Sequence, residues 1–159
     1  GRQAAIHLLG DWRDPAAGPY LRELVSANSE EATEACLGLG KLADQRAVPL
    51  LVTTVQNHDQ AIATRTAAAC ALLDLRQPRH AVPLMQAVLL AATPYGAGLE
   101  QAQGLPQKTR WAYERYMVIE AIRRFSNGET FGLDEDASWP RLRDGTAAFV
   151  RYAEQRQDR

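Results

Sequence analysis

The sequence predicts an all-α fold, and two observations carry this prediction. Alanine and leucine, both strong helix formers, contribute 27 and 19 of the 159 residues. The chain also repeats itself, because shifting residues 4–25 by 30 places onto residues 34–55 gives eight identities in 22 positions. A repeat of this period is typical of stacked helical hairpins. We therefore expect a right-handed α-solenoid whose last apolar face is covered by a C-terminal helical cap.

Each repeat unit is expected to hold two helices. The first is rich in alanine and leucine and ends at Gly10 or Gly40, where a left-handed residue is favoured. The second has a proline in its first turn, where a missing N–H group has no helical partner to lose. These prolines are Pro19, Pro49 and Pro83. Asp14 and Asp44 precede the second helices of the first two units and are predicted to be their N-caps.

The openings of the second helices carry a family resemblance. Residues 45–51 read Gln-Arg-Ala-Val-Pro-Leu-Leu, residues 80–84 read His-Ala-Val-Pro-Leu, and residues 15–21 keep only the skeleton of this pattern. The pattern resembles the short bacterial HEAT-like repeats of phycobilisome lyase components. The resemblance covers residues 4 to about 92 and implies about three HEAT-like hairpins over residues 1–92. In the third hairpin Pro78 stands at the cap position, so Asp74 is the substitute cap that we expect.

Beyond residue 92 the period fails. Residues 93–107 hold three glycines and two prolines and are expected to form a loop. Residues 108–125 have the apolar spacing of a helix, with Arg115 outside its apolar face, and Ser-Asn-Gly at 126–128 ends it.

A final helix completes the chain, with Asp136 as its expected N-cap. Its aromatic residues, together with those of the preceding segment, are expected to close the end of the array. These residues are Phe131, Trp139, Phe149 and Tyr152. Residues 108–159 are therefore predicted to belong to the same domain as the repeats.

The charge balance disfavours nucleic acid as a partner, and the apolar patterning excludes a membrane span. The chain has 18 basic and 19 acidic residues and a net charge of −1, so no overall field attracts it to nucleic acid. It has no apolar run of 18 residues and therefore no membrane span. We expect a soluble protein, with the cytoplasm as the favoured location. Because the chain begins with Gly1 and already looks helical there, we interpret it as the C-terminal part of a longer protein.

A search for catalytic chemistry finds little. His7, His58 and His80 lack metal-ligand spacing, and the acidic segment 134–136 starts like a calcium loop but lacks the required glycine and glutamate. Cys36 and Cys70 fall on equivalent positions of neighbouring first helices and are expected to be buried rather than paired. No glycine-rich phosphate loop or nucleophile elbow is present. We therefore expect no catalytic, metal or cofactor site, and no enzyme.

The predicted architecture favours a protein-binding scaffold, since a solenoid offers an extended groove. The second helices are expected to line the concave face and to bind an unidentified protein or another part of the same longer chain. The candidate residues are Tyr20, Glu23, Thr53, Gln56 and Gln86, with Val52 and Leu90 beside them.

Two other functions stay open. The phycobilisome resemblance implies a bilin lyase or a chaperone-like lyase component, which would change the absorbance of added bilin. Arginine outnumbers lysine 16 to 2, and the helix over residues 108–125 gathers arginines and aromatics that suit phosphate or base recognition. Glu114 and Glu120 lie between these arginines and are expected to form ordinary ion pairs with them along the helix. Nucleic-acid binding is therefore the less favoured function.

Overall fold

A computed structural model of the chain describes Ile6, residues 14–106 and residues 111–157. Its regular secondary structure is entirely helical over these residues, which confirms the all-α prediction. The α-helices are α2 (Gly18–Ser26), α3 (Ala32–Leu42), α4 (Val48–Gln56), α5 (Ile62–Asp74), α6 (Pro78–Leu90), α7 (Ala97–Ala102), α8 (Ala112–Phe125) and α9 (Trp139–Glu154). Short 3-10 turns, η1 (Pro15–Ala17) and η2 (Gln45–Ala47), lead into α2 and α4.

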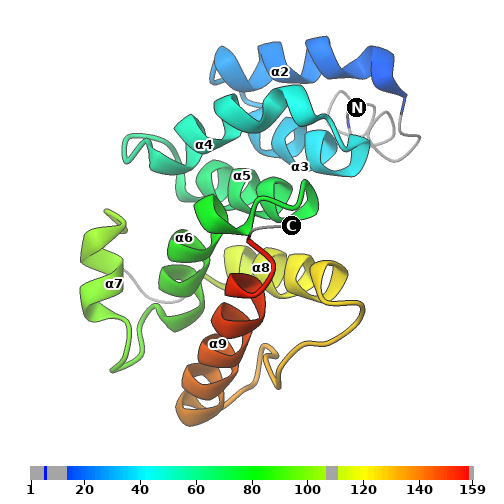
Figure 1. The fold of residues 1–159 in the computed structure, drawn as a ribbon. Helices are drawn as coiled ribbons and strands as arrows, with labels where there is room; N and C mark the ends of the chain where they lie inside the picture. Colours follow the sequence, from blue (N-terminus) through cyan, green and yellow to red (C-terminus); the bar gives the residue numbers. More distant parts are fainter. Residues whose placement is uncertain (1–5, 7–13, 107–110, 158–159) are drawn as a thin grey trace.

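The helices pack as two connected rows. In one row α3 packs on α5, and α5 packs on α8. In the other row α2 contacts α4, α4 contacts α6, and α6 packs on α9. Figure 1 shows the helices following one another from α2 at the top to α9 at the bottom. Helix α4 packs mainly on α5 rather than on α3.

The starts of α2 and α4 form as predicted. Asp14 and Asp44 cap η1 and η2, each accepting a hydrogen bond from the backbone N–H two residues later. Pro19 and Pro49 lie in the first turns of the helices that follow. At each start the aspartate satisfies a backbone N–H group, and the proline already has the φ angle that the first turn requires.

The start of α6 differs from the prediction. This helix begins at Pro78, so Pro83 lies inside it rather than in its first turn. Pro78 suits the first position for the same reason that Pro19 and Pro49 suit theirs, and it adds a turn ahead of Pro83. Asp74 does not act as the substitute cap, since its carboxylate binds the Arg124 guanidinium at 3.0 Å instead.

Gly40 has a different role from the predicted one. It lies inside α3, and Ala43 is the left-handed residue that ends the helix, with φ of 58°. A Cβ atom on Gly40 would lie 2.9 Å from Ala71 Cα and 2.9 Å from Asp74 Oδ2. The glycine is therefore required for the close approach of α3 to α5. Gly10 lies outside the described residues.

Small side chains dominate the middle of the core. Residues 67–71 of α5, four alanines and Cys70, are all fully buried, and Cys36 of α3 is buried as well. Both cysteines are free thiols, as predicted. Burial raises the pKa of Cys36 to about 12 and also raises that of Cys70, so neither thiol ionises at neutral pH.

The C-terminal region corrects two predictions. The stretch 93–107, expected to be a loop, contains α7, which packs on α6. Arg115 was placed outside the apolar face of α8, but it is 5% exposed and its Nη2 donates to the Ala91 carbonyl at 3.0 Å. The apolar face itself is buried as expected. Helix α8 ends at Phe125, with Ser126 as its C-cap and left-handed residues at Asn127 and Gly128.

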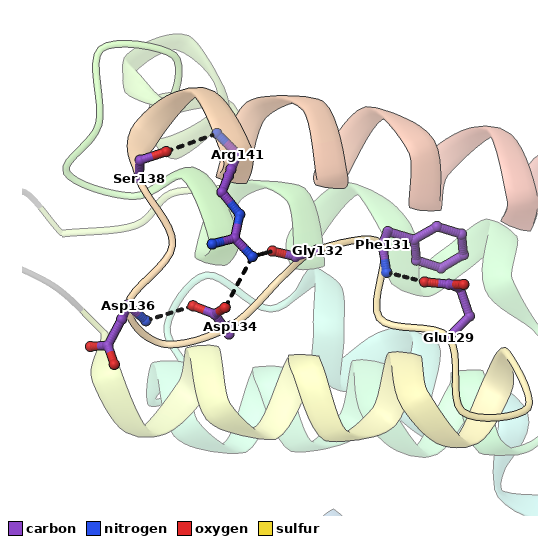
Figure 2. A network of polar contacts seen from close by, with 7 residues as sticks. All are labelled: Glu129, Phe131, Gly132, Asp134, Asp136, Ser138 and Arg141. Carbon is purple, nitrogen blue, oxygen red and sulfur yellow. Dashed lines mark hydrogen bonds and ion pairs between the residues drawn. The ribbon is translucent and has the colours of Figure 1, made fainter.

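Side-chain hydrogen bonds hold the segment between α8 and α9 in place (Figure 2). Arg141 Nη2 donates to the Gly132 carbonyl at 3.1 Å and to Asp134 Oδ2 at 3.2 Å. Ser138, not Asp136, caps α9 by accepting from the Arg141 N–H at 3.4 Å. Asp136 lies two residues before this cap, and its backbone N–H donates to Asp134 Oδ1.

Three of the four aromatic residues predicted to close this end pack against one another. Phe149 is fully buried, and the Phe131 ring lies 6.2 Å from that of Phe149 and 5.4 Å from that of Tyr152. Trp139 is the exception, since it is 50% exposed at the first position of α9. Among the described residues, no helix has the length and apolar character needed to cross a membrane.

Candidate binding surface

Helices α2, α4 and α6 each expose a stripe of residues at helical spacing. Side chains three or four positions apart share one side of a helix, so each stripe is a continuous ridge. Because α2 contacts α4 and α4 contacts α6, the three ridges belong to one row of helices. We call this set the second-helix face. Its exposed residues are Pro19, Tyr20, Glu23 and Ser26 on α2, Pro49, Thr53 and Gln56 on α4, and Arg79, His80 and Pro83 on α6.

The structure places most of the candidate residues on this face. Tyr20 is 42% exposed, and Glu23, Thr53 and Gln56 are exposed as well. The Thr53 hydroxyl donates to the Pro49 carbonyl at 3.1 Å. Gln86 is half-buried on α6.

Two neighbouring positions are less accessible than predicted. Val52 is half-buried, and Leu90 is only 6% exposed. Leu90 lies in the last turn of α6, which contacts α4, α5, α7, α8 and α9. These neighbours cover the side of α6 that carries Leu90, so the prediction that Leu90 points outward was wrong.

A buried link sets the position of α2 against the next unit. The Arg22 guanidinium of α2 pairs with the Asp44 carboxylate, whose side chain is 12% exposed. The same carboxylate caps η2, and it also lies 3.1 Å from the point where a Cβ of Gly18 would be. One carboxylate therefore ties the start of α4 to α2 and fixes the spacing of the first two ridges.

The second-helix face is polar and of mixed charge. Glu23 contributes an acid, Arg79 a base, and the remaining exposed side chains are neutral or histidine. His58 and His80 are both exposed, and His7 lies outside the described residues. Within the described ranges, no group of three or more His, Cys, Asp or Glu side chains could hold a metal ion.

The arginines of α8 do not form a free basic face. Arg124 binds Asp74, Arg123 pairs with Glu120 at 3.3 Å, and Arg115 is buried. Tyr113 and Tyr116 are about half-exposed on the same helix, at 52% and 49%. The helix thus offers two exposed rings, but its described cations already have partners.

The structure also has a cavity that the sequence did not predict. The cavity has a volume of about 280 Å³ and is lined by Arg76, Phe125, Asn127, Tyr152 and Arg156. These residues come from the α5–α6 turn, the end of α8 and the end of α9, so no local pattern joins them.

Comparison with known proteins adds no relative. No family model matches the chain, no curated protein matches it, and no solved structure matches it.

Proposed function

We propose that the chain is a protein-binding scaffold module, built as a HEAT-like solenoid, that binds its partner on the second-helix face. One observation carries the proposal: three successive second helices contact one another in a row, and each exposes a ridge at helical spacing. Repeated helical units stacked in one dimension commonly use such an extended face for binding.

The chemistry of the face fits a protein surface as partner. Backbone groups within helices are already hydrogen-bonded, so recognition falls to the side chains. Tyr20 offers an amphipathic ring of the type enriched at protein interfaces. Glu23, Thr53 and Gln56 offer an acid, a hydroxyl and an amide for the polar rim. The partner is an unidentified protein or another part of the same longer chain.

The test compares capture of proteins from source-cell lysate by three forms of the chain. The first form is unchanged. The second carries Glu23→Arg, Thr53→Arg and Gln56→Arg on the second-helix face. The third carries Glu135→Arg, Ala147→Arg and Gln101→Arg, which lie outside α2, α4 and α6 and change the net charge equally. Circular dichroism verifies that all three are folded.

The proposal expects one protein that the unchanged chain and the third form retain and that the second form loses. An equal loss in the second and third forms would show that charge, not location, decides binding. Retention by all three forms, or by none, would contradict binding on the second-helix face.

A further inference from the structure

The cavity at the ends of α8 and α9 holds two guanidinium groups against two aromatic rings. Arg76 Cζ lies 5.0 Å from the centroid of the Phe125 ring, and Arg156 Cζ lies 3.3 Å from that of the Tyr152 ring. The two rings meet edge to face, with centroids 5.9 Å apart. Each ring thus carries one guanidinium, and both guanidinium groups line the same cavity.

Both guanidinium groups are held in place by backbone carbonyls. Arg76 Nη1 donates to the Phe125 carbonyl at 3.1 Å, and Arg156 Nη1 donates to the Tyr152 carbonyl at 2.9 Å. These bonds and the stacking fix the side chains, so a ligand would meet groups that have already lost their freedom. A guanidinium has five N–H donors, and each of these bonds uses one of them.

The charge of the cavity is unbalanced. Neither Arg76 nor Arg156 pairs with a carboxylate among the described residues, whereas Arg22, Arg123, Arg124, Arg141 and Arg143 each do. No acidic residue is among the described residues that line the cavity, and the Asn127 side chain adds a neutral amide. Over the described residues, the site therefore has positive charge and N–H donors without a carboxylate to match them.

From this geometry we propose that the cavity binds a small carboxylate anion. A planar guanidinium presents parallel N–H groups that match the two oxygens of a carboxylate. Two such groups beside one cavity suit an anion with two carboxylates. A volume of about 280 Å³ suits a compact ligand rather than a nucleotide or a drug-sized molecule. This site does not depend on the second-helix face.

The test is a titration of the ¹⁵N-labelled chain with succinate, followed by backbone amide shifts. Succinamide serves as the neutral analogue, sodium chloride matches the ionic strength, and inorganic phosphate is the alternative oxyanion. We expect succinate to shift the amides of residues 125–127 and 152–156 with saturation and a Kd of about 1 mM. Succinamide and chloride should not produce saturating shifts there.

Two variants test the role of the arginines. Arg76→Gln with Arg156→Gln should weaken succinate binding at least about tenfold, because both charge-assisted contacts are lost. Arg46→Gln with Arg151→Gln removes the same charge from two exposed arginines that do not line the cavity, and it should leave the Kd unchanged. If the first variant does not fold, the location of the shifts in the unchanged chain decides.

Three results would overturn the proposal. Shifts that do not saturate, or that chloride reproduces, would show only general screening of charge. Equal weakening by the two variants would show that net charge rather than the cavity attracts the anion. Saturating shifts with phosphate but not with succinate would contradict the assignment of a carboxylate ligand.

Discussion

The contact between α3 and α5 and the closure of α8 and α9 are built in different ways. In the first, Gly40 and a run of alanines let two helix backbones come close together. In the second, Phe125, Phe131 and Tyr152 fill the space between elements with rings 5.4 to 5.9 Å apart. Small residues at one contact leave little tolerance for added atoms, whereas large rings at the other leave little tolerance for lost ones.

The largest effect is expected at the aromatic closure. Phe149→Ala removes a fully buried ring and should lower the free energy of unfolding by about 4 kcal/mol, measured by urea denaturation. Trp139→Ala removes a larger side chain that is half-exposed, and it should cost less than about 1 kcal/mol. Equal losses in the two variants would contradict the placement of Phe149 in the core and Trp139 outside it.

The next effect is expected at the close contact of α3 and α5. Gly40→Ala adds a Cβ that meets the Ala71 backbone, so it should lower the free energy of unfolding by about 2 kcal/mol despite the better helix propensity of alanine. Gly98→Ala in α7 is the matched control, because a Cβ there meets nothing within 4 Å. The control should be neutral or stabilising by up to about 1 kcal/mol. A neutral Gly40→Ala would contradict the close approach.

Effects of similar or smaller size are expected at the first two caps. Asp44→Ala removes both a cap and the partner of Arg22, and it should cost about 2 kcal/mol. Asp14→Ala removes only a cap and should cost about 1 kcal/mol. Thermal denaturation of both variants gives the comparison. If Asp14→Ala costs as much as Asp44→Ala, the link to Arg22 adds no stability.

The smallest effects are expected at the start of α9. Ser138→Ala removes the side-chain cap and should cost about 1 kcal/mol. Asp136→Ala should change the stability by less than about 0.5 kcal/mol, since its side chain is exposed and does not cap the helix. The reverse order in urea denaturation would restore Asp136 as the cap.

The helix starts were predictable because their chemistry is local. A capping aspartate and a first-turn proline act within three or four residues, so Asp14, Asp44, Pro19 and Pro49 could be assigned from spacing alone. Pro83 was misplaced because a second proline, five residues earlier, also satisfies the rule and starts α6 first. The sequence could not rank two acceptable starts.

The errors elsewhere come from contacts between distant segments. Gly40 is explained by α5, and the burial of Arg115 is explained by the Ala91 carbonyl, 24 residues away. Leu90 reads as outward on its own helix but is enclosed by five neighbours of α6. Helical spacing defines the sides of one helix, but it does not say which sides the other helices cover. The cavity of Arg76 and Arg156 was missed for the same reason.

Photo-crosslinking in source-cell lysate tests whether a partner binds on the second-helix face. A photoreactive amino acid is placed at Thr53 on the second-helix face in one form, and at the exposed Ala147 of α9 in another. We predict that the Thr53 form crosslinks to one specific protein and that the Ala147 form does not. Crosslinking from Ala147 alone, or from neither position, would contradict the claim.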